Sequence, residues 1–150
     1  CYLATGAAAG ADPHWAARIA RHRDRRPPDW TTVECADVAA RLRSHPDTAT
    51  LVDDIGGWLT AALDRRGWDE GSVAADADEL LTAVSEFRAP LVLVSPEVGL
   101  SVVAPSAAGR RFADELGSLN QRLARCCESV VLVVAGLAVQ VKSQTTEAGS

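Results

Sequence analysis

Residues 49–56 read ATLVDDIG, an apolar run that ends in two aspartates, an isoleucine and a glycine. Two further runs have the same character, APLVLVSPEVG at 89–99 and SVVLVVAGL at 129–137, and CYLAT at 1–5 is a shorter fourth. The three longer runs are rich in Val, Leu and Ile and show no alternation of apolar and polar residues. This pattern is typical of strands that are covered on both faces of a parallel sheet.

Helical patterns lie between these runs, over 37–43, 57–66, 72–87 and 107–125. The last of them carries a single apolar stripe, because its large apolar residues recur at three- and four-residue spacing. Strands that alternate with helices in this way predict an α/β domain, with a mostly parallel sheet flanked by helices. We expect this domain to cover residues 1–142 and a polar tail or linker to cover 143–150.

Composition narrows the class of protein. A chain of 150 residues with a net charge of -5 fits one globular domain. Residues 18–26 nevertheless hold five arginines and a histidine, and such a local basic patch favours a small anionic ligand over the wide surface that a nucleic acid needs. Four cysteines without CxxC spacing predict reduced thiols in a cytoplasmic protein. No apolar run reaches the ~20 residues of a membrane span.

The ends of the predicted strands are where chemistry is expected, because ligands of open α/β sheets bind outside the carboxyl ends of the strands. Thr5 and Gly6 follow the first run, and Asp53 ends the second. A strand that ends in aspartate is the Walker-B pattern, whose carboxylate helps hold Mg²⁺ on nucleotide phosphates. The alternative is that Asp53 only begins the next helix or turn. The phosphate-loop motif GxxxxGK[ST] is absent from these residues, which either rules out the Walker-B interpretation or means that the loop lies upstream of Cys1.

The basic segment AARIARHRDRR, residues 16–26, also allows two interpretations. It is a good helix former, and a basic helix is often no more than a solvated face. However, Pro27 and Pro28 end it sharply, and arginine side chains offer forked donors that suit phosphate oxygens. Between these arginines lies His22, and an imidazole near bound phosphates is a competent nucleophile toward phosphorus.

Four motifs follow one another in unbroken order. They are YLAT at 2–5, RIxxHRxxRPxxWxTxE at 18–34, LVD followed by WLT within 51–60, and VSxEVGL…RRFxDELGxLNQxLA at 94–124, after which comes VVLVVAGL at 130–137. Together they resemble the bifunctional adenosylcobinamide kinase / adenosylcobinamide-phosphate guanylyltransferase family of cobalamin biosynthesis. The resemblance implies a P-loop-type α/β fold, with the first strand and the phosphate loop lying before Cys1.

The resemblance also implies a function. The family phosphorylates adenosylcobinamide, then transfers GMP from GTP onto adenosylcobinamide-phosphate through a guanylylated histidine, which falls on His22. ATP, GTP and Mg²⁺ are the implied nucleotides and metal, with Asp53 as the metal ligand. The implied partners are the two cobinamide substrates, further copies of the chain in a homo-oligomer, and a fused domain of the same pathway. The implied nucleotide-binding residues are Ala4, Thr5, Gly6, Arg23, Asp24, Arg25, Arg26, Glu34 and Asp53.

The chain departs from the family pattern at several places, since an acidic residue and Met commonly stand where it has His14 and Trp15, and Ser101 replaces a glycine. Pro96 stands where the family usually has Asn, and Asp54-Ile55-Gly56-Gly57 stands where it usually has Cys-Leu-Thr-Leu. Glycines inside a helix destabilise it by about 1 kcal/mol each relative to alanine. The alternative to an active enzyme is therefore a degenerate family member that lacks the phosphate loop and serves as a structural or fused domain. A basic-helix nucleic-acid binder is disfavoured, because one short arginine cluster offers too few phosphate contacts.

Overall fold

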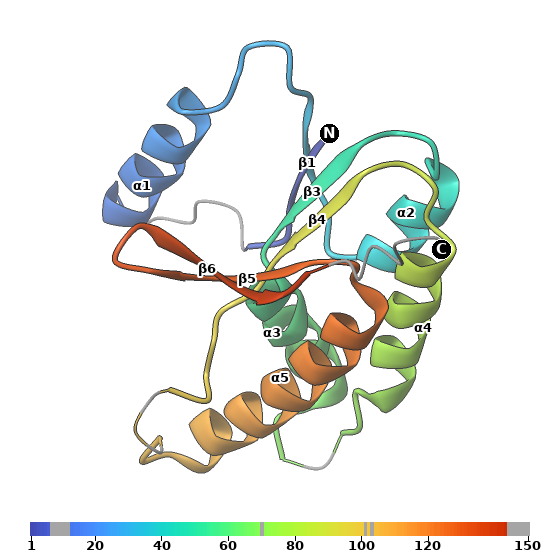
Figure 1. The fold of residues 1–150 in the computed structure, drawn as a ribbon. Coiled ribbons are helices and arrows are strands. Elements are labelled where there is room, and N and C mark those ends of the chain that lie inside the picture. The colour runs from blue at the N-terminus through green and yellow to red at the C-terminus, as the bar shows by residue number, and fades with distance from the viewer. Residues whose placement is uncertain (7–12, 70, 101, 103, 144–150) are drawn as a thin grey trace.

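The computed structural model describes residues 1–6, 13–69, 71–100, 102 and 104–143 (Figure 1). In chain order the elements are β1 (Tyr2–Ala4), α1 (Pro13–Asp24), β2 (Thr32–Glu34), α2 (Val38–Ser44), β3 (Thr50–Asp53), α3 (Ile55–Arg66), α4 (Ala74–Ser85), β4 (Leu91–Val94), α5 (Ala107–Cys126), β5 (Val130–Val134) and β6 (Leu137–Lys142). Most of the predicted tail, residues 144–150, lies outside the described residues.

A four-stranded sheet in the order β2-β1-β3-β4 organises the fold. All of its neighbouring strands run parallel, and helices lie beside it, which confirms the predicted α/β class. The sequence patterns did not predict β2, because its three residues, TVE, form no apolar run. β2 nevertheless takes an edge position beside β1, so β1 is flanked by a parallel strand on each side.

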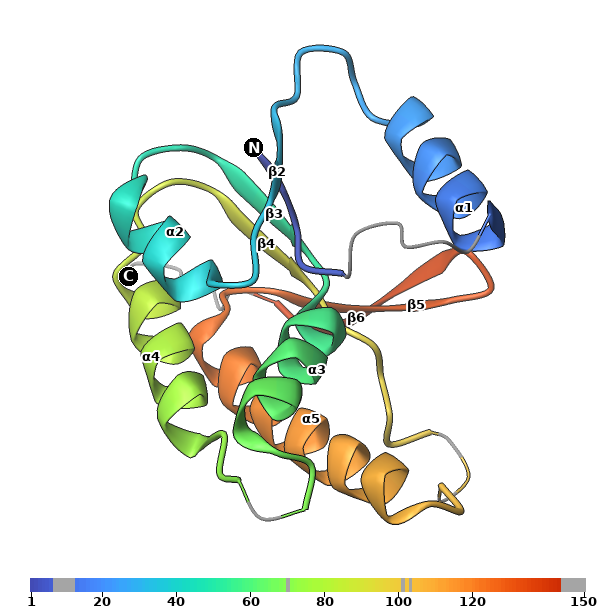
Figure 2. The ribbon, with the colours of Figure 1, turned by 180° about the vertical axis from the view of Figure 1, so that it is seen from behind.

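One face of the sheet forms the core. In the strand register Leu3 lies beside Val52, and Val52 lies beside Leu93, so these three side chains share a face. Figures 1 and 2 show α2 and α4 on the opposite side of the sheet from α1, with α3 and α5 at the lower end. The largest fully buried side chains come from β1, β3, the segments leading into α3 and α4, and helices α2 to α5: Leu3, Val38, Leu42, Val52, Ile55, Leu59, Leu63, Val73, Leu80 and Leu116.

The other face is largely open, which corrects the expectation that every strand is covered on both sides. Tyr2, Leu51 and Val92 lie in one row across this face. Val92 is 53% exposed, whereas its neighbour Leu93 is partly buried against the core. Among the described elements, α1 is the helix on this side, and none of its described residues belongs to the core cluster.

The run at 129–137 was predicted as a buried strand of the parallel sheet, and this prediction was wrong. Val130–Val134 instead pairs antiparallel with Leu137–Lys142 in a separate two-stranded hairpin. Ala135 and Gly136 form its two-residue turn with φ of 51° and 78°, the positive values that such tight hairpins require. Valine and leucine side chains of both strands are exposed, so the apolar run reflects β-propensity rather than burial.

Two charged side chains, Arg111 and Lys142, hold the segments at the two ends of α5. Arg111, in the second turn of α5, donates hydrogen bonds to the carbonyls of Gly67, Trp68 and Gly71 in the loop between α3 and α4. At the other end of α5, the ammonium of Lys142 donates to the carbonyls of Ala124, Arg125 and Cys127. These carbonyls lie at the C-terminal end of α5, where no following turn of the helix supplies N–H donors to them. Lys142 supplies the donors instead and so attaches the hairpin to the helix end.

The start of α3 shows why two successive glycines occur there. Asp54 is the N-cap, and its carboxylate accepts a hydrogen bond from the amide of Gly57 at 2.6 Å. A Cβ on Gly56 would lie 3.0 Å from Cγ of Pro96, and a Cβ on Gly57 would lie 3.0 Å from Oγ1 of Thr5. The departures from the family pattern at Pro96 and Gly56 are therefore linked, because Pro96 packs against the position that Gly56 leaves empty.

Two further observations concern the cysteine thiols and the apolar character of the helices. All four cysteines have free thiols. Within the described ranges, no helix combines the length and the apolar character that a membrane crossing needs.

We expect Gly57→Ala to destabilise the protein by about 1–3 kcal/mol despite the higher helix propensity of alanine. The reason is that Thr5 cannot move away from the new methyl group, since its hydroxyl is held by two hydrogen bonds to the backbone of Asp54. Gly117→Ala in α5 is the control, because its Cβ would meet only a methyl of Val98 at 3.9 Å. Urea unfolding should show a gain of up to about 1 kcal/mol for this control, and equal effects of the two changes would contradict the close approach at Gly57.

Candidate functional site

Three neighbouring strands end together at the predicted site. Ala4, the last residue of β1, lies in register with Glu34 of β2 on one side and Asp53 of β3 on the other. Residues that are in register project from the same face of a sheet. The two carboxylates therefore flank Ala4 on the open face, at the carboxyl edge where ligands of α/β sheets bind.

The segment after β1 is braced against the segment after β3. Thr5 is 5% exposed, and its amide donates to the carbonyl of Asp53 at 3.1 Å. Its hydroxyl donates to the carbonyl of Asp54 at 2.5 Å and accepts from the amide of Asp54 at 2.9 Å. Gly6 follows on the surface, and no atom of the described residues lies within 4 Å of the place a Cβ would take, so none of them blocks a close approach to its backbone. Thr5 therefore holds the ends of β1 and β3 together, and Gly6 lies on the surface beside them.

The basic segment forms the last turn of α1 and the residues after it. His22 is exposed, as are the side chains of Asp24 and Arg25, and among the described residues no hydrogen bond or ion pair joins these three to the strand ends. Arg23 lies within 3.9 Å of the Glu34 carboxylate, with both side chains more than half exposed. An exposed ion pair of this kind contributes little to stability, so Arg23 can exchange Glu34 for a ligand oxygen at small cost.

Arg26 is held more firmly than its neighbours. Its guanidinium lies over the ring of Tyr2 at 3.4 Å from the centroid, and one terminal nitrogen donates to Oγ1 of Thr32 at 3.0 Å. The Tyr2 hydroxyl donates to Oδ2 of Asp53. The Nε of Arg26 is buried, and it has no hydrogen-bond partner within the described part of the chain. A buried donor without a partner is unfavourable, so the Nε of Arg26 is a candidate donor to an anionic oxygen.

Burial and the neighbouring Asp53 carboxylate, in that order, raise the pKa of Tyr2 from 10.0 to about 12, and the Arg26 guanidinium opposes the shift. Tyr2 is a phenol at neutral pH and donates a hydrogen bond to Asp53, and the raised pKa extends this form to higher pH. The single tyrosine of the chain therefore links the predicted metal ligand to a predicted phosphate ligand.

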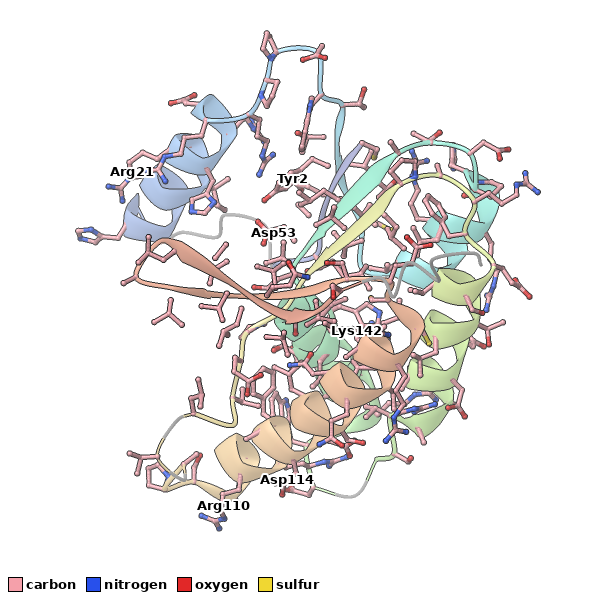
Figure 3. The ribbon with its side chains drawn as sticks, in the orientation of Figure 1. Tyr2, Arg21, Asp53, Arg110, Asp114 and Lys142 are labelled. Carbon is pink, nitrogen blue, oxygen red and sulfur yellow. The ribbon has the colours of Figure 1, made fainter. Side chains whose placement is uncertain are left out.

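The structure brings together some predicted residues and leaves others apart. Arg23, Arg26, Glu34 and Asp53 meet at the open face, and Ala4 lies between the two carboxylates. Figure 3 shows Tyr2 and Asp53 close together between α1 and the sheet, whereas Arg21 projects from the far side of α1.

A further arginine pair, Arg110 and Arg111, does not join this group. Arg110 lies near the start of α5, well away from Tyr2 and Asp53 (Figure 3), and it donates to the carbonyls of Ala104 and Pro105. Arg111 is taken up by the loop after α3. Both arginines therefore serve the local structure around α5.

Two sets of residues were not predicted. Tyr2 was passed over, although its position two residues before Ala4 places it on the same strand face as Asp53. The second set holds the loop after β4, where the Ser95 hydroxyl donates to Oδ1 of Asn120 at 2.6 Å and the Asn120 amide donates to the carbonyl of Pro96 at 3.0 Å. The signal for Asn120 was its position in a quoted motif, but its partner cannot be deduced from one sequence.

The acidic residues present are compatible with Mg²⁺ held jointly with a nucleotide. Among the described residues no group of three or more His, Cys, Asp or Glu side chains could hold a metal ion alone. Mg²⁺ usually keeps several waters and takes one or two carboxylates together with substrate phosphates, so one free oxygen of Asp53 suffices. The Asp54 carboxylate is occupied by the α3 cap and adds no ligand.

A parallel α/β sheet with carboxylates, arginines and an approachable glycine at one carboxyl edge is typical of proteins that bind a ligand at that edge. Residues 1–141 match the cobinamide kinase / cobinamide phosphate guanyltransferase family. The chain therefore belongs to this family.

Individual proteins similar to this chain have names that fit the same family. The chain is 38% identical over 146 residues to the bifunctional adenosylcobalamin biosynthesis protein CobP of Pseudomonas aeruginosa, an alignment that covers 95% of this chain and 82% of the relative. It is 35% identical over 145 residues to the bifunctional adenosylcobalamin biosynthesis protein CobU of Salmonella typhimurium, with 87% and 80% covered. The CobU protein of Escherichia coli is 34% identical over the same length.

We expect Tyr2 to titrate at about pH 12 in the folded protein and near its ordinary value of 10 after unfolding. The phenol is favoured in the folded state, so its contribution to stability is complete below pH 10 and is lost as the pH rises toward 12. Phenolate absorbance measures this titration directly, because the chain has one tyrosine. Asp53→Asn should move the folded-state pKa back toward 10, and a wild-type titration near 10 in the folded protein would contradict the Tyr2–Asp53 hydrogen bond.

Proposed function

We propose that the protein acts in cobalamin biosynthesis as a nucleotide-dependent transferase that converts adenosylcobinamide-phosphate and GTP into adenosylcobinamide-GDP through a guanylylated His22. The complete protein is proposed to phosphorylate adenosylcobinamide first, with ATP or GTP as donor. The observation that carries the proposal is the meeting of Arg23, Arg26, Glu34 and Asp53 at one sheet edge, at the end of the helix that bears His22, in a chain of this family.

In the first half-reaction a ring nitrogen of His22 attacks the α-phosphorus of GTP. A nitrogen–phosphorus bond forms, the bond from the α-phosphorus to the bridging oxygen breaks, and the electron pair leaves with pyrophosphate. His22 is exposed in the last turn of α1, so its ring can reach a nucleotide that lies between α1 and the sheet. A covalent intermediate divides one difficult displacement into two easier ones.

The charged residues supply binding and charge compensation for this step. Arg23 and Arg26 neutralise phosphate oxygens, with the buried Nε of Arg26 as a donor that has no other partner among the described residues. Gly6 allows the backbone to approach the phosphates. Asp53 would hold Mg²⁺ together with the phosphates, and the ion when bound offsets the negative charge that develops on the leaving group.

In the second half-reaction a phosphate oxygen of adenosylcobinamide-phosphate attacks the same phosphorus. The nitrogen–phosphorus bond breaks, its electron pair returns to the imidazole of His22, and a new phosphoanhydride bond completes adenosylcobinamide-GDP. The exposed position of His22 leaves room for a bulky acceptor. The same arginines serve both halves, because in both reactions the negative charge lies on the oxygens around the same phosphorus.

The complete gene product, incubated with GTP labelled at the α-phosphorus and with Mg²⁺, should acquire one label that is lost in acid and stable in base. We expect His22→Ala to abolish this label, because no other side chain is proposed to form the bond. His45→Ala and His14→Ala are matched controls, since these are the other two histidines and both are exposed. Both control variants should be labelled like the wild type.

The outcomes separate the two interpretations of the chain. Equal labelling of His22→Ala would show that the nucleophile is another residue. A complete gene product that takes no label from GTP, although it is folded, would favour the degenerate family member with a structural or fused role. The first half-reaction should release one pyrophosphate for each GMP group that becomes attached to the protein, and measuring both quantities tests this ratio.

A further inference from the structure

Tyr2 connects two groups that the proposed function uses separately. It is 7% exposed, with its hydroxyl on Asp53 and its ring beneath the guanidinium of Arg26. Figure 3 shows Tyr2 and Asp53 facing one another on the open side of the sheet. Its row neighbours on this face, Leu51 and Val92, are apolar. Because apolar side chains fill the neighbouring positions of this row, packing alone does not require a tyrosine here.

The hydrogen bond to Asp53 determines how that carboxylate is presented. A carboxylate at the end of a strand can rotate about its side-chain bonds, and a donor on Oδ2 fixes its plane. The other oxygen, Oδ1, is then directed away from the tyrosine. Partners that orient a metal ligand in this way typically contribute 10- to 100-fold to metal affinity or activity.

The ring determines where Arg26 lies. A guanidinium stacked on an aromatic face keeps its in-plane N–H groups available, because stacking uses the flat face of the group. One terminal nitrogen of Arg26 is bonded to Thr32, and its Nε is buried without a partner in the described part of the chain. The arginine is thus held by two contacts, and these leave its Nε without a partner in the described part of the chain.

We propose that Tyr2 is a positioning residue for nucleotide and Mg²⁺, which orients the Asp53 carboxylate through its hydroxyl and the Arg26 guanidinium through its ring. This inference rests on the proposed function, because it assumes that Asp53 and Arg26 face a magnesium nucleotide. It assigns two separable tasks to two parts of one side chain. The hydroxyl can be removed while the ring is kept, and the two can be removed together.

Tyr2→Phe removes the hydroxyl and keeps the ring, so we expect it to raise the Mg²⁺ concentration needed for half-maximal effect by about 10-fold while metal-free nucleotide binding stays unchanged. Thr32→Val is the matched control, since it removes a contact of Arg26 and leaves Asp53 untouched. It should weaken nucleotide binding without changing the Mg²⁺ requirement. Tyr2→Leu removes both parts and should show both effects.

The measurements are titrations of a fluorescent GTP analogue with and without Mg²⁺, and the Mg²⁺ dependence of His22 labelling. The first reports binding and does not depend on turnover. Thermal unfolding of each variant measures the contribution of packing. If Tyr2→Leu does not fold, the comparison of Tyr2→Phe with Thr32→Val still tests the task of the hydroxyl, because only Tyr2→Phe changes the group that contacts Asp53.

An unchanged Mg²⁺ requirement in Tyr2→Phe, together with wild-type binding and labelling, would overturn this inference and leave the proposed function standing. A wild-type protein that binds no nucleotide and takes no label would overturn the proposed function, and the inference with it. A change in thermal stability alone, without any change in the Mg²⁺ requirement, would show that Tyr2 serves only packing.

Discussion

The central position of β1 is the constraint on which the rest of the structure depends. This short strand pairs in parallel with β2 and with β3, so a single register sets the positions of Glu34 and Asp53 relative to Ala4. The Thr5 hydroxyl then ties the end of β1 to the backbone of Asp54, at the first turn of α3. Because Gly57 approaches this hydroxyl, the helix, the strand end and the acidic edge form one rigid unit.

Much of the fold could be predicted from the sequence, because apolar runs and helical periodicity report burial. The stripe through Leu116, Leu119 and Leu123 is buried as expected. The hairpin was mispredicted because Val130–Val134 is apolar without being covered, and one sequence cannot distinguish a buried strand from a β-branched strand that faces solvent. β2 was missed because its pairing with β1 is a long-range contact and leaves little trace in TVE.

The candidate site residues that lie directly after predicted strands could be identified from the sequence. Asp53 and Gly6 were identified by position, and Arg23 and Arg26 by charge. Glu34 came from the family resemblance alone, and its pairing with Arg23 gives it a physical partner. Tyr2 was missed because its importance lies in two contacts from different parts of the chain, a cation above its ring and a carboxylate at its hydroxyl.

Lys142 is the only lysine in the chain, and its ammonium is bonded to three carbonyls at the end of α5. Figure 3 shows it where the hairpin meets that helix. Side-chain chemistry directed at amines, whether a crosslinker, a fluorescent ester or coupling to a sensor surface, is therefore concentrated on this one structural junction. Such a reagent would compete with the helix for the same nitrogen, so its rate of reaction reports how often the hairpin separates from α5.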